Sequence, residues 1–353
     1  MTGLHRKSLT RLLHAASLER KPRVKQRARS YGLATEQVIV RVWESRDYIC
    51  AERLTPGLLS MAQHLARFEP LGLTSQVQEQ LAMISRATVA RILRKYRSRM
   101  RRLPQKGAER ANSATKGVPM GRIPWDTQEP GHFEVDLVYH SGETTGGLHG
   151  HTIQLIDVAT GWSERAAVLG RSQQAMKGGF EHILGRLPFP VKELHPDNGS
   201  EFFNHHLVRY WKDKVTGVQL SRSRPWHKND NRMVEQKNDT LVRQYLGDLR
   251  LDTSEQMAAL NALYEDMWLY YNLFQPVLHL AEKQMVGDKV VRRWDAAKTP
   301  YERLLASGIL SAEQQTRLQQ LYEQTHPLQL RNALYRQLET LWQSAMAPSS
   351  SAA

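Results

Sequence analysis

The middle of the chain alternates short segments of period two with segments of helical spacing. Apolar and alternating runs predict strands over residues 132–140, 151–159, 163–169, 191–196 and 217–223. Helical spacing predicts helices over residues 172–187 and 204–214, and a further helix that contains Glu235 near its start. Strands interleaved with helices favour an α/β architecture, a mixed sheet flanked by helices.

The strand at 132–140 separates apolar from acidic side chains. Alternate side chains of a strand share a face. Phe133, Val135, Leu137 and Tyr139 therefore point one way, and His132, Glu134 and Asp136 point the other way. We expect the apolar face to pack on helices and the carboxylates to face an open site.

Residues 31–100 have an all-helical pattern. One helix is predicted over 34–46, and another after Thr55-Pro56 with the proline in its first turn. The segments 74–84 and 85–95 are separated by a sharp break, and Ser85 is a good N-cap for the second. Val89, Ile92 and Leu93 form its inward stripe, which leaves Arg86, Thr88, Arg91 and Lys95 outside. This pattern predicts a helix-turn-helix with a recognition helix, although any antiparallel helix pair also leaves polar residues outside.

Charge and cysteine content restrict the partner and the compartment. The formal net charge is +14, which points to a polyanionic partner. Cys50 is the single cysteine, so an intrachain disulfide and a Cys-ligated zinc finger are excluded and a reducing compartment is favoured. No apolar stretch approaches the roughly 20 residues of a membrane span, so no membrane partner is expected.

Four motifs follow one another in the second half of the chain. They are Glu134-Val-Asp-Leu-Val138, Leu155-Ile-Asp-Val-Ala-Thr-Gly-Trp162, Asp197-Asn-Gly-Ser-Glu-Phe202, and Ser223-Arg-Pro-Trp-His-Lys-Asn-Asp230 followed by Val234-Glu-Gln-Lys-Asn238. With them, the block from Gly131 to about Gln275 resembles the catalytic core of the DDE transposases and retroviral-type integrases. The likeness is closest to bacterial insertion-sequence transposases, and it implies a ribonuclease-H-like core.

The resemblance implies that Asp136, Asp197 and Glu235 are both the catalytic residues and the metal ligands. Mg²⁺ prefers oxygen ligands, and a pair of ions can stabilise the attacking and leaving oxygens of a displacement at phosphorus. Two Mg²⁺ ions per site are therefore expected, with Mn²⁺ as a substitute. Asp136 would bridge both ions, and Asp197 and Glu235 would each hold one.

Several other side chains compete for these roles. Glu134 shares the face of Asp136, Asp157 matches an aspartate that is structural in the family, and Glu201 suits a helix cap. Asp230 and Asp239 flank Glu235. His149-Gly-His151 is better explained by a hairpin than by a zinc site, and His195 by packing than by phosphate contact.

Basic and aromatic residues supply the predicted DNA contacts. They gather on the second segment of the helix-turn-helix, in the linker and in the loop before the Glu235 helix: Arg86, Arg91, Lys95, Arg101, Arg102, Arg222, Arg224, Trp226, His227, Lys228 and Lys237. For Lys237 a solvated helix face is nearly as good an explanation.

The chain is thereby divided into six segments. They are a basic arm (1–30), a helix-turn-helix region (31–100), a basic linker (101–128), the catalytic core (129–250), a helical C-terminal region (251–345) and a disordered tail (346–353). Past residue 254 the pattern is almost wholly helical, with one basic interruption at 289–293. The arm loosely resembles an organelle transit peptide, but the bacterial likeness favours a DNA-contacting arm.

The resemblance implies DNA transposition. The protein would bind the ends of its mobile element, nick the 3′ ends and transfer them to target DNA. It would act in the cytoplasm on the nucleoid, as a dimer or higher homo-oligomer that holds two ends together. Two alternatives are a domesticated DNA-binding regulator without catalysis and a nuclease of the same fold that only hydrolyses.

Overall fold

The structure is a computed structural model of the chain. It describes residues 30–96, 120–143, 146–196, 217–223, 230–286 and 289–346, together with residues 10, 13 and 14. The chain divides into two compact units, Met1–Leu33 and Ala34–Ala353. The predicted basic arm lies almost wholly outside the described residues, as do most of the predicted linker and the predicted helix over 204–214. The sheet and its helices all belong to the second unit.

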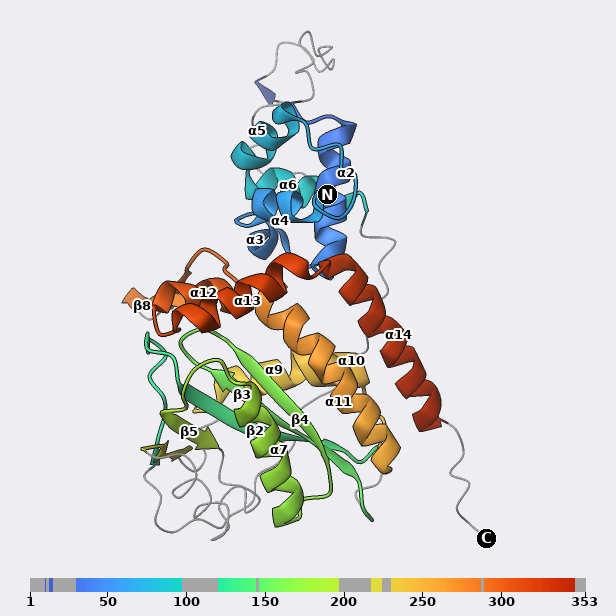
Figure 1. Cartoon of the computed structure of the whole chain (residues 1–353). Helices are drawn as coiled ribbons and strands as arrows, with labels where there is room; N and C mark the ends of the chain where they lie inside the picture. The colour runs from blue at the N-terminus through green and yellow to red at the C-terminus, as the bar shows by residue number, and fades with distance from the viewer. Residues whose placement is uncertain are drawn as a thin grey trace. The chain divides into compact units, whose positions relative to one another are not determined.

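A five-stranded mixed sheet forms the centre of the second unit, in the order β4-β3-β2-β5-β6 (Figure 1). Its strands are β2 (His132–His140), β3 (Gly150–Asp157), β4 (Ser163–Leu169), β5 (Glu193–Pro196) and β6 (Gln219–Leu220). β3 is antiparallel to both β2 and β4, whereas β5 runs parallel to β2 and to β6. The predicted strand over 217–223 is split, because its last part forms β7 (Arg222–Ser223), which pairs with β1 (Met120–Gly121).

Helix α7 (Gln173–Arg186) covers one face of the sheet. It begins at the N-cap Ser172, whose side chain accepts from the backbone N–H of Ala175, and it ends before Pro188 as predicted. The helix lies so close to the sheet that a Cβ on Gly179 would be 2.6 Å from a methyl of Ile153. Glycine is therefore needed here for a close approach of helix and sheet.

The opposite face is covered by a continuous helical run and the helix that follows it. The run consists of α9 (Arg232–Lys237), the π-helical η2 (Asn238–Arg243) and α10 (Gln244–Leu246), and α11 (Ser254–Leu269) comes next. Val138 of β2 packs in one core cluster with Val242 and Leu260 of these helices. Since helices cover both faces, the predicted mixed sheet flanked by helices is confirmed.

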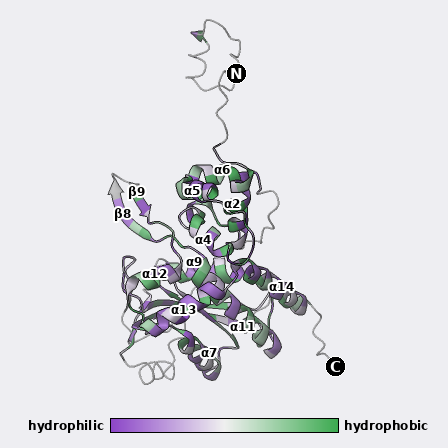
Figure 2. Ribbon diagram, turned by 45° about the horizontal axis from the view of Figure 1, so that its top comes forward, coloured by the Kyte–Doolittle hydropathy of each residue, from purple (hydrophilic) through white to green (hydrophobic). Residues whose placement is uncertain are grey.

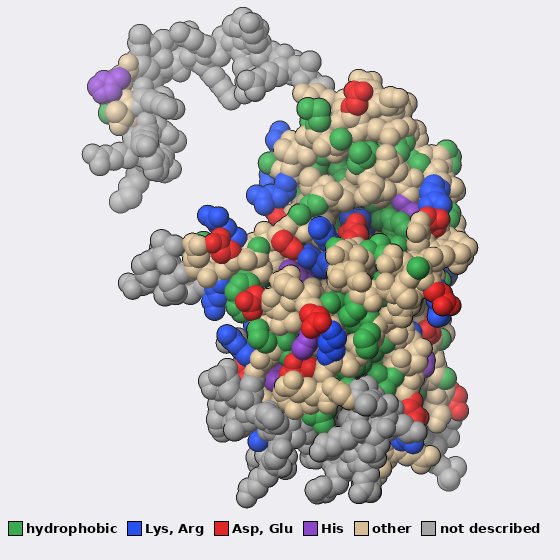
Figure 3. All heavy atoms as spheres, turned by 60° about the vertical axis from the view of Figure 1, so that its left-hand side comes forward, with side chains coloured by type: hydrophobic (Ala, Val, Ile, Leu, Met, Phe, Trp, Pro, Cys, Tyr) green, Lys and Arg blue, Asp and Glu red, His purple; other side chains and the backbone are tan. Residues whose placement is uncertain are grey.

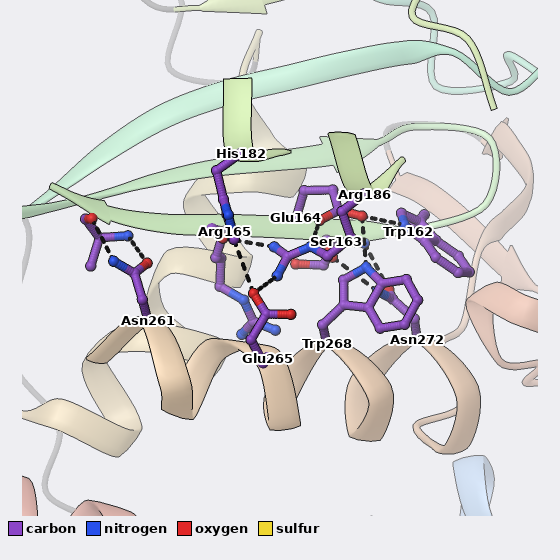
Figure 4. Close-up of polar contacts among 11 residues, drawn as sticks. Trp162, Ser163, Glu164, Arg165, His182, Arg186, Asn261, Glu265, Trp268 and Asn272 are labelled. Carbon is purple, nitrogen blue, oxygen red and sulfur yellow. Dashed lines mark hydrogen bonds and ion pairs between the residues drawn. The ribbon is translucent and has the colours of Figure 1, made fainter. Parts of the chain in front are cut away.

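The outer edge of β4 is closed by two asparagines, one from α11 and one from η3 (Tyr270–Phe274) (Figure 4). The side chain of Asn261 accepts from the Ala167 N–H at 2.8 Å and donates to its carbonyl at 2.9 Å. Asn272 makes the same pair of bonds to Ser163, at 2.9 and 3.0 Å. The outward backbone groups of Ser163 and Ala167 are thus satisfied by side chains, which covers this edge against pairing with another strand.

The N-terminal part of the second unit consists of helices. They are α2 (Leu33–Ser45), α3 (Ala51–Leu54), α4 (Leu58–Leu65), α5 (Ser75–Met83) and α6 (Arg86–Arg94). The predicted cap is confirmed, because the Ser85 hydroxyl accepts from the Thr88 N–H at 3.3 Å. The predicted inward stripe Val89, Ile92 and Leu93 is buried. The prediction for Pro56 was wrong: α4 begins two residues later with Gly57 as N-cap, since residues 55–57 make the turn out of α3.

A half-buried aspartate ties these helices to the rest of the unit. Asp47 has a φ of 53° and lies in the turn after α2. Its carboxylate accepts from Nε of Arg331 at 2.8 Å and from the hydroxyls of Tyr335 and Tyr245 at 2.9 and 3.0 Å. Arg331 and Tyr335 belong to α14 (Pro327–Met346), so one side chain connects the N-terminal helices, α10 and the last helix.

The C-terminal region contains a β-hairpin as well as helices. After η3 the chain forms β8 (Leu280–Val286) and β9 (Lys289–Trp294), and then α12 (Pro300–Ser307), α13 (Ala312–Gln324) and α14. The prediction of an almost wholly helical chain past residue 254 was therefore wrong at 280–294. The sequence signal was the Gly-Asp pair at 287–288 before two valines, which favours a turn between strands. None of the described helices has both the length and the apolar composition needed to cross a membrane.

Candidate active site

Asp136 lies in the middle of β2, on the face that α9 covers. Its Oδ1 accepts from the backbone N–H of Leu137 at 2.8 Å, and its Oδ2 accepts from the side-chain amide of Asn238 at 2.5 Å. Asn238 is buried and begins η2, directly after α9. The hydrogen bond from Asn238 therefore holds the carboxylate of Asp136 against the helical run that carries Glu235.

Glu134 occupies the same face of β2 but makes different contacts. Its carboxylate accepts from the backbone N–H groups of Met233 and Val234 at 2.7 and 3.0 Å. These are unpaired donors of the first turn of α9, whose N-cap Asn231 makes no side-chain cap. The positive end of the helix dipole favours a carboxylate at this place. Glu134 thus fixes the start of α9, and the expectation that it faces an open site was wrong because it is 1% exposed.

The charge state of Glu134 reflects this position. Burial raises its pKa to about 7, against the two backbone N–H groups and Arg232, which lower it. The negative charge of Glu235 adds to the rise, so these two carboxylates lie within electrostatic range of each other.

Glu235 is exposed on α9, between the two points at which the helical run is attached to β2. Met233 and Val234 precede it and are bound to Glu134; Asn238 follows it and is bound to Asp136. Residues three apart on a helix are neighbours on its surface, so Glu235 and Asn238 lie on the same side of the run. Glu235 thus lies on a helical run that is attached to the β2 face of Asp136 both before and after it, and its role as a metal ligand stays a prediction.

The third predicted ligand, Asp197, lies outside the described residues, as does Glu201. The strand that precedes it is described. β5 ends at Pro196, which is paired with Val135 in the parallel register with β2. The last described residue before Asp197 thus lies beside the residue before Asp136.

The remaining carboxylates and histidines of the motifs have structural contacts. Asp157 is fully buried and accepts from the N–H groups of Gly131 and Thr160, both at 2.8 Å, and from the Thr160 hydroxyl. His195 is fully buried, with Nδ1 2.6 Å from the hydroxyl of Ser221. His151 lies in β3, which pairs antiparallel with β2, so the predicted hairpin is confirmed. Tyr139, expected on the packed face, is 44% exposed, so that expectation was wrong for the end of β2.

The donor set suits a hard cation. Asp136 and Glu235 offer carboxylate oxygens on two separate elements, which is what Mg²⁺ takes from proteins. Within the described part of the chain, no three His, Cys, Asp or Glu side chains are placed to hold a metal ion. The predicted metal site, whose third carboxylate belongs to Asp197 outside the described residues, therefore stays a prediction.

The predicted DNA contacts divide into described and undescribed residues. Arg86 and Arg91 are exposed on α6, and Lys95 forms an ion pair with Glu36 at 2.6 Å. Lys237 lies over the ring of Tyr271 at 5.0 Å, and Arg222 is buried in β7. The others lie outside the described residues: Arg101, Arg102, Arg224, Trp226, His227 and Lys228. All of these assignments stay predictions.

The structural roles of two residues next to Asp136 and Glu235 were not predicted. Asn238 appeared only as the last letter of a motif, although its position three residues after Glu235 is a signal for a shared helix side. The capping role of Glu134 had no local signal, since its partners lie about a hundred residues further along the chain.

Comparisons with known proteins give one long match and several partial ones. No family model matches the chain. The chain is 34% identical over 304 residues to "Uncharacterized protein y4rM" of Sinorhizobium fredii, and the match covers 86% of each protein. It is 30% identical over 91 residues to the Pro-Pol polyprotein of feline foamy virus, a match that spans 26% of this chain and 8% of the polyprotein.

Two solved structures are similar at low TM-scores. The catalytic core domain of BIV integrase has a TM-score of 0.31 and 17% identity, with 50% of this chain and 95% of that chain covered. A simian T-cell lymphotropic virus intasome in complex with a PP2A regulatory subunit has a TM-score of 0.35 and 14% identity, with 67% and 73% covered. Scores at this level do not establish a common fold.

Proposed function

The chain belongs to the family of the uncharacterized protein y4rM of Sinorhizobium fredii, and we propose that it is a DNA transposase of the DDE type. It binds the ends of its mobile element, nicks the 3′ ends and transfers them to target DNA by phosphoryl transfer. The sequence likeness to part of a Pro-Pol polyprotein and the four ordered motifs are consistent with this reaction class.

One observation carries the proposal. The helical run that carries Glu235 is attached to the β2 face of Asp136 at two points, through Glu134 before Glu235 and through Asn238 after it, and this supports a shared site for Asp136 and Glu235. The neighbouring parallel strand β5 ends beside β2 one residue before Asp197. The strand order, three antiparallel strands followed by two parallel ones, also suits a ribonuclease-H-like core.

Each residue has a defined task in this proposal. Asp136, Asp197 and Glu235 would hold two Mg²⁺ ions, which would stabilise the attacking and leaving oxygens at phosphorus. Asn238 orients the carboxylate of Asp136, and Glu134 fixes the start of the helix that presents Glu235. Asn238 acts through the ligand Asp136, and Glu134 acts through the helix of the ligand Glu235, so both are positioning residues.

The partner is DNA. The net charge of +14 favours a polyanion, and α5 with α6 forms a helix pair whose exposed Arg86 and Arg91 suit a recognition helix. A homo-oligomer that holds two element ends, and a place on the bacterial nucleoid, belong to the same proposal.

Strand nicking tests the proposal. Terminal inverted repeats in the DNA that flanks the gene would supply the substrate, and the full-length protein is incubated with that duplex and Mg²⁺. Asp136→Asn, Asp197→Asn and Glu235→Gln should each reduce nicking by more than about 100-fold, because loss of a ligand should exceed the 10–100-fold cost of losing a second-layer partner. Asp239→Asn, one turn from Glu235, is the matched control and should nick normally.

Normal nicking by Asp136→Asn or Glu235→Gln would refute the assigned site. Strand joining then separates a transposase from a nuclease that only hydrolyses. Pre-cut ends with a 3′-OH should become joined to a target plasmid, whereas the same ends with a 3′-deoxy terminus should bind equally and never join. Nicking without any joined product would favour the nuclease.

A further inference from the structure

The β8–β9 hairpin stands apart from the sheet and the helices (Figure 2). It forms its own two-stranded sheet, and its strands pair antiparallel from Leu280 opposite Trp294 to Val286 opposite Lys289. An isolated two-stranded hairpin is only marginally stable by itself. The hairpin therefore requires stabilising contacts at the point where it joins the rest of the chain.

The base of the hairpin is fixed by a network around Asp295. The carboxylate of Asp295 accepts from the His279 N–H at 2.8 Å and forms an ion pair with Arg303 of α12 at 2.7 Å. The backbone of Asp295 in turn donates to the His279 carbonyl at 3.0 Å. Both ends of the hairpin are therefore held to one another and to α12.

The base also lies near the helix of the candidate active site. Burial lowers the pKa of His279 to about 4, and the positive charges of Arg303 and Lys237 add to the decrease. Lys237 is the last residue of α9 and follows Glu235 by two positions. The hairpin thus begins within electrostatic range of the helix that presents Glu235.

The two faces of the hairpin differ in charge. On one face Arg293 forms an ion pair with Glu282 at 3.5 Å. On the other face Lys283 lies directly opposite Arg292, and both are exposed and without an ion pair to any described residue. Like charges directly opposite each other destabilise a strand pair. The arrangement has an unfavourable energy unless an anion lies across both cations.

An exposed tryptophan extends the same face. Trp294 is two residues beyond Arg292 in β9, so its side chain points to the same side, and it is 56% exposed. A large aromatic side chain that is mostly exposed next to two unpaired cations is typical of nucleic-acid contact surfaces. In Figure 3, Lys and Arg side chains recur along the margin of the molecule on which the hairpin lies.

From these observations we propose that the β8–β9 hairpin is a DNA-binding ribbon, whose face with Lys283, Arg292 and Trp294 lies on the phosphate backbone of duplex DNA. A two-stranded ribbon has the width that the major groove admits, and strands of other proteins bind DNA in this way. The inference rests on the proposed function, since it assigns a further contact surface for the DNA that this function requires.

The salt dependence of binding tests the ribbon. The full-length protein is titrated with a random-sequence duplex at several salt concentrations, which isolates the contribution of the phosphates. Replacing Lys283 and Arg292 together by Ala should lower the slope of log K against log salt by about 1.8, which is about 0.9 for each lost phosphate contact. Trp294→Ala should weaken binding at every salt concentration and leave the slope unchanged.

Arg293→Ala is the matched control, because it removes a cation of the same ribbon from the opposite, ion-paired face. It should change the slope less than Lys283→Ala or Arg292→Ala does, and an equal change would overturn the assignment to one face. The Tm of the double variant should equal or exceed that of the wild type, because a repulsive pair is removed. A lower Tm would mean that the pair is structural and would overturn the proposal.

The outcome can be separated from that of the proposed function. If the wild type nicks DNA while the double variant keeps the wild-type slope, the ribbon is refuted and the transposase stands; an acidic protein would then be the better partner for this face. If the slope of the double variant is lower by about 1.8 while the wild type never nicks, the ribbon is supported without the transposase.

Discussion

Two buried glutamates on the same sheet have opposite surroundings. Glu164 on β4 accepts from the indole N–H groups of Trp162 and Trp268 at 2.8 and 2.7 Å, and it forms an ion pair with Arg186 at 2.8 Å (Figure 4). Glu134 on β2 accepts two backbone hydrogen bonds from the first turn of α9, and it has the like charge of Glu235 nearby. The charge of Glu164 is compensated at the covered β4 edge, whereas Glu134 lies close to other acidic side chains.

The difference separates stability from function. At the β4 edge every acid has a partner of opposite charge or a strong donor, as expected where a buried charge must be compensated. On the β2 face Glu134 shares its side of the strand with Asp136 and experiences the like charge of Glu235 at the start of α9. Such a grouping of like charges has an energetic cost in a folded chain, and it is retained where the chemistry of a site uses the charges.

The largest effect on stability is expected at the β4 edge, from the replacement of Glu164. Replacement of Glu164 by Ala leaves the guanidinium of Arg186 without its buried partner and two indole donors unpaired. We expect a loss of about 3–5 kcal/mol in the free energy of unfolding, the usual cost of breaking a buried pair from one side. Urea denaturation measures it, with the exposed Glu255→Ala as control. A loss no larger than that of the control would show that the network does not stabilise the edge.

A somewhat smaller effect, with a pH dependence, is expected at Glu134. Its pKa is raised to about 7 in the folded chain, so the stability that it contributes is present below its unfolded pKa and is lost as the pH rises through 7. The Gln variant keeps an acceptor for the helix start and has no proton to lose. The unfolding free energy of Glu134→Gln relative to wild type should therefore increase by roughly 3 kcal/mol between pH 4.5 and pH 8.

Denaturation of both proteins at several pH values gives this difference directly. Groups that titrate alike in wild type and variant cancel in the comparison. A difference that stays constant over the whole range would mean that Glu134 does not titrate as its burial requires.

The smallest effect is expected at Asn238, which bonds to Asp136 without being a ligand. Its replacement by Ala removes one hydrogen bond from the Asp136 carboxylate and should reduce nicking by about 10–100-fold, the range for residues that orient metal ligands. Because the loss acts through orientation of a ligand, the Mg²⁺ concentration for half-maximal rate should rise as well. Thr240→Ala, in the same π-helical segment, is the control. Unchanged rate and Mg²⁺ dependence in Asn238→Ala would remove this residue from the site.

The local sequence pattern was sufficient to predict those features that depend on a single helix or strand. Period-two alternation located β2, and helical spacing over 172–187, which stops before Pro188, located α7. The face of β2 that carries Asp136 also followed from alternation. Asn238 follows Glu235 by three residues, and this spacing predicts that both lie on the same side of the helix. It does not predict the hydrogen bond from Asn238 to Asp136.

Other features depend on contacts between distant segments. The role of Glu134 comes from the docking of a helix about a hundred residues away, and the edge of β4 is closed by asparagines from α11 and η3. The hairpin at 280–294 was missed because its charged residues interrupt the apolar alternation that marks a half-buried strand. A ribbon that buries neither face has no such pattern.

Metal binding is the most direct test of the central claim that Asp136 and Glu235 belong to one site. Mn²⁺ binding to the full-length protein with duplex DNA can be followed by electron paramagnetic resonance, with Asp239→Asn as control for background binding. We expect Asp136→Asn and Glu235→Gln to lose the same protein-dependent Mn²⁺ signal, and the double variant to lose no more than either single one. Retention of the wild-type signal by both single variants, or additive losses from two independent signals, would contradict the account.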